Sequence, residues 1–177
     1  MEIKIRVSSI KVSEIADDVK KALTEGLNRA ASGLRESIAK DVFAKYAIKK
    51  MDIKKQITVS KANKNRLQAI LNVKNWTRFG RIPLSWFPFS QKKAGVVVEV
   101  FRGKKQLIKS SFWSRFMRAA ASTIARRVDK PRLPVKELTA ADLGVMVLSV
   151  FKLAQIDRVV ELFNRNFKSY LKFLRAK

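Results

Sequence analysis

The first third of the chain carries one dominant helical pattern of apolar residues. Before it, Ile3, Ile5 and Val7 alternate with polar residues, which predicts a short strand with one buried face. After Ser13, a candidate N-cap, apolar residues recur every three or four positions, which predicts a helix of about 33 residues. The apolar stripe of that helix comprises Ile15, Val19, Leu23, Leu27, Ala30, Leu34, Ile38, Val42 and Tyr46.

Two glycines and one aspartate affect how this helix is expected to run and end. Gly26 and Gly33 lie inside the helical pattern, so a bend or a break is expected as an alternative to a regular helix. Asp52 is a candidate cap for a short second helix over Ile53–Ile57.

Period-two alternation replaces the helical pattern in the middle of the chain. It predicts a strand over Arg66–Lys74, and the Val-rich composition of Ala94–Phe101 predicts another. A turn at Arg102-Gly103-Lys104 leads into Lys105–Ser110, which is expected to return as the partner strand of a hairpin. Ser122–Val128 has the composition of one further strand.

Three other stretches have weaker patterns. Asn75–Lys93 holds two prolines and several aromatics and is expected to be an ordered loop. Ser111–Ala121 has no clear period, and a helical turn is one interpretation. Val135–Leu148 is also irregular, with Thr139 as a candidate cap.

The C-terminal region returns to a helical period and completes the expected fold. Its amphipathic helix carries Ile156, Val159, Val160, Phe163, Phe167, Tyr170, Leu171 and Leu174. The order of elements predicts an α+β fold, with a small, mostly antiparallel sheet packed against a long N-terminal helix and a long C-terminal helix. We expect a single domain over residues 1–177.

The net charge of the chain points to function more directly than its overall composition does. The chain has 177 residues and is 47% apolar, yet it holds 39 Lys and Arg against 14 Asp and Glu, a net charge of +25. Such a charge destabilises a compact monomer by self-repulsion, so a neutralising partner is expected. Nucleic acid is the commonest such partner, followed by an anionic membrane surface and acidic protein surfaces.

The excess charge is concentrated in one part of the sequence. Residues 45–132 hold 23 bases and 3 acids, whereas residues 1–44 have a net charge of +1 and residues 133–177 a net charge of +4. We therefore expect the segment 45–132 to face a polyanion, although any single lysine is better explained as a solvated surface residue. The candidate DNA-facing residues are Lys49, Lys50, Lys54, Lys55, Lys61, Lys64, Arg102, Lys104 and Lys105.

Residue types that are missing exclude many enzyme classes. There is no Cys and no His, so disulfides, the usual zinc sites, Ser-His-Asp triads and Cys-His pairs are excluded within this chain. The basic segment contains only Asp52, Glu99 and Asp129, too widely spaced to suggest a magnesium-dependent nuclease. No glycine-rich phosphate loop is present. We expect no enzyme activity, and no catalytic, cofactor-binding or metal-binding residues.

The sequence also lacks the usual marks of a membrane protein. No signal peptide is recognised, and the longest apolar stretch, Leu143–Phe151, is too short to span a bilayer. The C-terminal helix has Asp157 and Glu161 on its polar face, unlike a uniformly cationic membrane-surface helix. A soluble protein made in a reducing cytoplasm is expected.

Two clusters interleave aromatic residues with arginine. They are Trp76-Thr77-Arg78-Phe79 and Phe112-Trp113-Ser114-Arg115-Phe116. Such clusters can stack single-stranded bases, but packing in a core or at a subunit interface is the favoured interpretation.

Several segments, taken in order, carry a family resemblance that covers roughly residues 20–175. The sequence resembles the phage minor tail protein Z family, except that Met117–Lys130 lacks the glycine-rich turn expected there. The matching segments are Asn28-Arg29-Ala30, Tyr46 with Ile48 and Ile53, Ile82-Pro83-Leu84, and Arg132-Leu133-Pro134-Val135.

The resemblance implies a structural role in the virion neck. Such a protein would complete the tail and join it to the head as a homo-oligomeric ring of about six copies around the DNA channel. Its partners would be copies of itself, the tail terminator or tail tube, head-side adaptor proteins and the packaged DNA. Its location would be the virion, after assembly in the bacterial host cytoplasm. A stand-alone basic nucleic-acid-binding protein is the alternative, and a metal-dependent enzyme acting on nucleic acid is a distant third.

Overall fold

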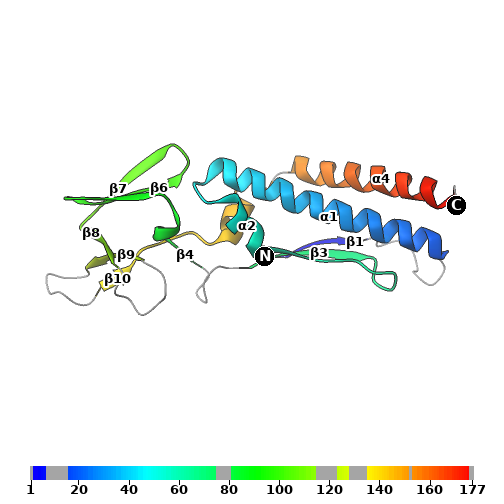
Figure 1. Ribbon diagram of the computed structural model, residues 1–177, viewed down its shortest axis with the longest axis horizontal. Helices are drawn as coiled ribbons and strands as arrows, with labels where there is room; N and C mark the ends of the chain where they lie inside the picture. Colours follow the sequence, from blue (N-terminus) through cyan, green and yellow to red (C-terminus); the bar gives the residue numbers. More distant parts are fainter. Residues whose placement is uncertain are drawn as a thin grey trace. The chain divides into compact units, whose positions relative to one another are not determined.

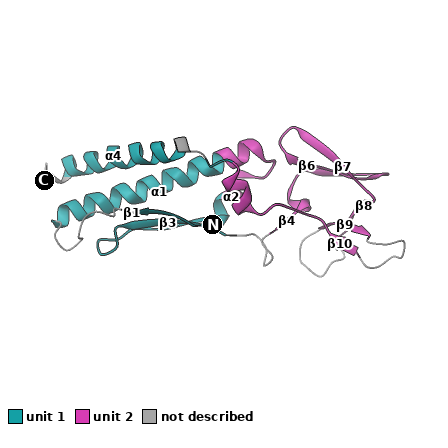
Figure 2. Ribbon diagram, turned by 180° about the vertical axis from the view of Figure 1, so that it is seen from behind, with its two compact units in different colours: residues 1–40, 54–74, 150–177 teal, residues 41–53, 75–149 magenta. Residues whose placement is uncertain are grey.

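The computed structural model describes residues 2–6, 16–74, 81–114, 123–127, 135–151 and 153–175. The chain divides into two compact units whose segments alternate along the sequence (Figure 2). Unit 1 comprises residues 1–40, 54–74 and 150–177, and unit 2 comprises residues 41–53 and 75–149. Long helices at both ends and short antiparallel strands between them confirm the predicted α+β class.

Unit 1 combines one sheet with the two long helices. The sheet has the order β1-β3-β2, and both pairings are antiparallel. Within unit 1, α1 lies between this sheet and α4 (Figure 1). The elements are β1 (Glu2–Arg6), α1 (Asp17–Lys45), α2 (Lys50–Gln56), β2 (Ile57–Ser60), β3 (Gln68–Val73) and α4 (Leu153–Arg175), of which the last residues of α1 and the first of α2 belong to unit 2.

The core of unit 1 follows from the two sequence periods. The helical stripe of α1 buries Leu27 and Ile38, and the sheet buries Ile57 and Leu71. Each such side chain is worth about 1.5–3 kcal/mol when it is fully removed from water. Asn28 adds a polar link, because its side-chain oxygen accepts from the Ala62 amide at 2.8 Å and its side-chain nitrogen donates to the Ala62 carbonyl at 3.2 Å.

The predicted bend or break at Gly26 and Gly33 does not interrupt α1, which is helical over all 29 residues. Both glycines lie where α4 approaches closely. A Cβ atom at Gly26 would stand 3.2 Å from the Phe163 ring, and one at Gly33 would stand 2.9 Å from Leu162. These glycines therefore provide room for α4. The Ser13 cap prediction lies outside the described residues.

The described residues of unit 2 form three small sheets and a short helix. Their strand orders are β5-β6-β7, β10-β9-β8 and β11-β4, with every pairing antiparallel. The elements are β4 (Ile82–Pro83), the 3-10 turn η2 (Leu84–Trp86), β5 (Phe89–Lys92), β6 (Gly95–Phe101), β7 (Lys104–Lys109), β8 (Ser111–Ser114), β9 (Thr123–Arg127), β10 (Val135–Glu137), β11 (Thr139–Ala140) and α3 (Leu143–Leu148).

The structure confirms the β6–β7 hairpin and the strand β9, but the strands do not form one continuous sheet. Ser110 has a φ of 57° between β7 and β8, so the chain turns there and β8 pairs with β9 instead. Residues 111–114 are therefore extended, and the helical turn suggested for Ser111–Ala121 is wrong for them. Within Asn75–Lys93, the described part forms β4, η2 and β5.

Two capping predictions were also wrong. Thr139 lies in β11, and Asp142 caps α3 instead, where its side chain accepts a hydrogen bond from the Val145 amide at 2.8 Å. Helix α2 begins at Lys50, so Asp52 lies in its first turn and does not precede it. The short helix ends at Gln56 because Ile57 already pairs with Val73 in the sheet.

We predict that Gly95→Ala destabilises unit 2 far more than Gly103→Ala does. Gly95 has a φ of 149°, and a Cβ atom there would lie 2.1 Å from the Ile108 carbonyl oxygen, whereas Gly103 (φ 79°) has open space around it. We expect a loss of more than about 3 kcal/mol for Gly95→Ala and about 1 kcal/mol for Gly103→Ala in urea unfolding. Equal losses would contradict the close approach of β6 and β7 at Gly95.

Candidate nucleic-acid interface

The first basic row of unit 2 crosses the sheet β5-β6-β7. Lys92 of β5 and Lys109 of β7 both pair with Gly95 of β6, so the two lysines flank one backbone position. Both side chains are exposed. Since facing residues in neighbouring strands share one side of a sheet, this row presents two positive charges together with no side chain between them.

The second basic row crosses the sheet β8-β9-β10. Arg126 of β9 lies directly opposite Lys136 of β10, and Ser111 of β8 completes the row. Arg126 and Lys136 are exposed, and facing Cβ atoms in such pairs lie about 5 Å apart. Two like charges therefore face each other across neighbouring strands.

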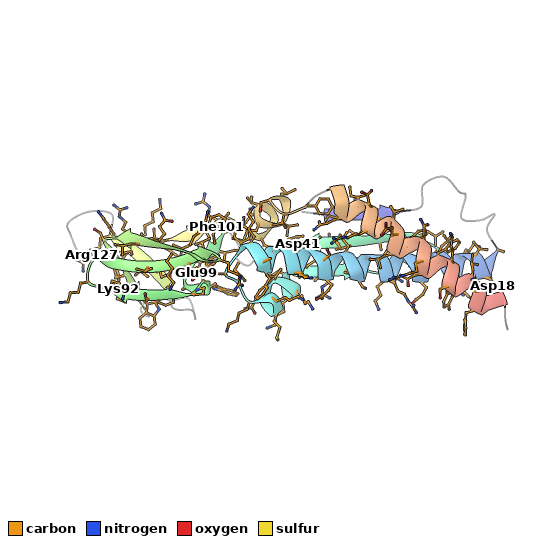
Figure 3. All side chains as sticks on the ribbon, turned by 90° about the horizontal axis from the view of Figure 1, so that it is seen from above. Asp18, Asp41, Lys92, Glu99, Phe101 and Arg127 are labelled. Atoms are coloured by element: carbon orange, nitrogen blue, oxygen red, sulfur yellow. The ribbon has the colours of Figure 1, made fainter. Side chains whose placement is uncertain are left out.

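The two rows are neighbours in the fold. Lys109 ends β7, and Ser111 begins β8 after the single turn residue Ser110. Ser111 also ties the sheets together, because its hydroxyl accepts a hydrogen bond from the Val96 amide at 3.0 Å. In Figure 3, Lys92 on β5 and Arg127 on β9 lie toward the same end of unit 2. We call Lys92, Lys109, Arg126 and Lys136 the basic strand surface.

Sequence reasoning did not single out this surface, because strand register decides which lysines face each other. The nine predicted residues are instead divided between the units. Lys49, Lys50, Arg102, Lys104 and Lys105 belong to unit 2, and Lys54, Lys55, Lys61 and Lys64 belong to unit 1.

Arg102 has a structural role in unit 2. Its side chain donates to the carbonyl oxygens of Phe43 at 3.0 Å and Tyr46 at 3.4 Å, and its guanidinium lies 4.2 Å from the centre of the Phe43 ring. The Ala47 amide also donates to the Val100 carbonyl at 3.0 Å. Arg102 therefore holds the β6–β7 turn against the end of α1.

The other predicted lysines differ in their surroundings. Lys54 forms an ion pair with Glu36, and the carbonyl of Lys54 accepts a hydrogen bond from Arg35 at 2.6 Å, so this residue joins α2 to α1. Lys104 and Lys105 are exposed at the start of β7. Lys61 and Lys64 are exposed between β2 and β3.

The described aromatic residues of the second aromatic cluster pack inside unit 2. Trp113 is half-buried, with its ring 6.2 Å from that of Phe89. Phe112 is also half-buried, and the Arg127 guanidinium lies 5.9 Å from the centre of its ring. This supports packing over base stacking for Phe112 and Trp113. The remainder of that cluster and the whole cluster at Trp76 lie outside the described residues.

One polar cluster in unit 2 contains groups that are used in nucleophilic catalysis elsewhere. The Ser149 hydroxyl lies 2.9 Å from the Tyr46 hydroxyl and 3.1 Å from the Lys45 ammonium. However, Ser149 also donates to the Met146 carbonyl at 2.7 Å, and Lys45 donates to the Ser149 carbonyl at 3.3 Å. These bonds satisfy the carbonyls of Met146 and Ser149 where α3 ends, which is a sufficient structural explanation.

The described residues show neither a cluster of metal ligands nor a membrane-spanning helix. They contain no group of three or more acidic, His or Cys side chains placed to hold a metal ion. None of the helices, over the residues described, is long and apolar enough to cross a membrane.

Comparisons with known proteins return no similarity. No protein-family model matches the chain, and searches of curated proteins and of solved structures find no match.

Both units carry the excess charge. Unit 1 has 21 bases and 8 acids, a net charge of +13, and unit 2 has 18 bases and 6 acids, a net charge of +12. The fold therefore divides the basic segment 45–132 between the two units.

We predict that Lys136→Glu raises stability and lowers affinity for DNA. The substitution turns the facing Arg126–Lys136 pair into one of opposite charge, which is worth about 0.5–1 kcal/mol at low salt. Urea unfolding and a fluorescence-anisotropy titration with duplex DNA measure the two effects. Lys136→Gln is the control and should give about half of each change. A loss of stability would show that these two charges do not repel each other in the fold.

Proposed function

We propose that this chain is a structural protein of the phage neck. In this proposal it completes the tail and joins it to the head as a homo-oligomeric ring around the DNA channel. The basic strand surface then faces the packaged DNA. The protein acts by binding and assembly, and the proposal assigns it no catalytic step.

The like-charge rows of unit 2 are the observation that carries this proposal. Arg126 faces Lys136, and this pair costs folding energy through repulsion unless an anion lies nearby. Lys92 and Lys109 add two exposed positive charges on either side of Gly95. Phosphates supply that neutralisation without any base-reading geometry. A neck channel fits because passing DNA must be accommodated whatever its sequence.

The sequence resemblance supplies the virion part of the proposal. The order of segments from Asn28-Arg29-Ala30 to Arg132-Leu133-Pro134-Val135 resembles the minor tail protein Z family. A ring also accounts for apolar side chains left exposed on a small chain, among them Phe101, Leu107 and Val160.

A stand-alone nucleic-acid-binding protein is the second candidate. The basic strand surface supports this function as well as it supports a neck protein, because phosphate contacts do not depend on assembly. Oligomeric state separates the two functions. A closed ring in light-scattering or electron-microscopy measurements supports the neck protein, and a monomer that coats DNA supports the alternative.

We predict that Lys92→Glu combined with Lys109→Glu weakens binding to duplex DNA and reduces its salt dependence. If both lysines contact phosphates, the slope of log affinity against log salt should fall in magnitude by about two. The affinity at low salt should drop by at least about tenfold, and the sequence of the DNA should not matter. Titrations at several salt concentrations measure both quantities.

Lys40→Glu combined with Lys168→Glu is the matched control, with the same change in net charge on α1 and α4. Both lysines are exposed. This control should reduce affinity only weakly and leave the slope nearly unchanged. Equal effects of the two double variants would mean that net charge alone attracts DNA, and the proposed surface would be rejected.

A further inference from the structure

Unit 2 contains an apolar cleft that the DNA-binding proposal does not use. Its volume is about 620 Å³, within the usual range of binding sites in proteins. The cleft is bounded by the inner face of the β6–β7 hairpin, the segment at β11, and α3. Its main apolar lining residues are Leu84, Val98, Phe101, Ile108, Leu138 and Met146.

Two lysines give this cleft a positive edge. Lys104 and Lys105 line it and are exposed. Phe101, which pairs with Lys104, is also exposed although it lines the cleft. The cleft therefore suits an apolar surface that carries negative charge beside it.

Helix α4 of unit 1 has a surface with that combination. Its face toward α1 includes Leu162 and Phe163, which lie against Gly33 and Gly26. Ile156 and Val160, one helical turn apart, remain 44% and 51% exposed. Asp157 and Glu161 follow each of them in sequence and are exposed too. Residues four apart on a helix lie on the same side, so Ile156 and Val160 form an apolar pair, and Asp157 and Glu161 form an acidic pair about 100° further around the helix.

These two carboxylates differ from all other acidic residues that the structure describes. Ten of the twelve described carboxylates have a partner within the chain, such as Glu25 with Arg29, Glu36 with Lys54 and Asp142 with the Val145 amide. Asp157 and Glu161 make no hydrogen bond or ion pair with another described residue. In a chain of net charge +25, they are the free acidic groups of the described structure.

We propose that the α4 surface of Ile156, Asp157, Val160 and Glu161 docks into the unit 2 cleft of a second copy of this chain. Ile156 and Val160 enter the apolar cleft, and Asp157 and Glu161 pair with Lys104 and Lys105 of that copy. Two copies otherwise repel each other, so a contact between them needs the few available carboxylates.

This contact uses different surfaces on the two copies. Such a head-to-tail contact generates a ring when the rotation closes, and a filament when it does not. The inference rests on the proposed self-assembly and names the surface that produces it. It also gives Lys104 and Lys105 a protein partner, which leaves the basic strand surface for DNA.

Cysteine cross-linking tests the contact directly, because the natural chain has no cysteine. Full-length Val160→Cys and full-length Gln106→Cys, a cleft residue, are mixed and oxidised. Each chain then holds one thiol, so a disulfide between the two variants reports a contact between copies. We expect at least about tenfold more mixed dimer than with the control pair, because docking raises the effective thiol concentration.

The control pair replaces Val160→Cys with Ser169→Cys. Ser169 is exposed on α4 and lies about 180° around the helix from Val160, at about 100° per residue. Mixed dimers at equal yield in the two pairs would overturn the proposal. Val160→Cys dimers formed more readily than mixed dimers would also overturn it, since they indicate a symmetric contact.

Charge reversal provides a second measurement. Asp157→Lys with Glu161→Lys should weaken self-association at least about tenfold in sedimentation experiments, and adding Lys104→Glu with Lys105→Glu should restore most of it. Glu2→Lys with Asp18→Lys is the control for net charge and should weaken association less. If adding Lys104→Glu with Lys105→Glu does not restore self-association, the result counts against the contact.

The wild-type protein separates failure of this inference from failure of the proposed function. If it stays monomeric at all concentrations, with and without DNA, the proposed ring is wrong and the inference fails with it. If the wild-type protein forms oligomers, but the cysteine pairs do not cross-link selectively and the charge reversal does not weaken association, only the docking surface is wrong.

Discussion

The scarcity of carboxylates constrains the whole of this structure. Fourteen acidic residues accompany 39 bases, and most of the acidic residues described are already used inside the fold. Asp17 and Asp18 lie in the first turn of α1, where their negative charges interact favourably with the positive end of the helix dipole. Asp142 caps α3, and Glu36 pairs with Lys54. The exposed strands of unit 2 therefore keep their positive charge, which the proposed DNA partner would neutralise.

The folding energy of each unit comes from apolar packing, which tolerates this charge. Unit 1 buries the stripe of α1, including Leu27 and Ile38, whereas unit 2 buries Val96 and Val98 on the inner face of β6. The lysines lie at exposed positions, where water and salt screen them. Different residues therefore provide stability and charge. The buried apolar residues stabilise the fold, and the exposed lysines determine which partners can bind.

The two proposed interactions divide the surface by chemistry. The basic strand surface groups four exposed positive charges, of which Arg126 and Lys136 face each other, and it suits a polyanion of any sequence. The cleft is apolar with two lysines at its edge, and it suits the apolar and acidic surface of α4. In the two proposals together, DNA neutralises the basic strand surface, and the α4 contact joins neighbouring copies.

The sequence by itself determined the α+β class, both long helices, the β6–β7 hairpin and the excess of positive charge, because these depend on local periods and on composition. Tertiary structure decided the rest. A bend or break at Gly26 and Gly33 was one expectation for α1, yet these glycines make room for Phe163 and Leu162 of α4. The turn at Ser110 divides the strands among separate sheets, and strand register brings Lys92 near Lys109 and Arg126 opposite Lys136. The packing of α4 on Gly26 and Gly33 joins residues far apart in sequence, and the pairing of the charged residues depends on strand register, which turn geometry and the buried side of each strand set together.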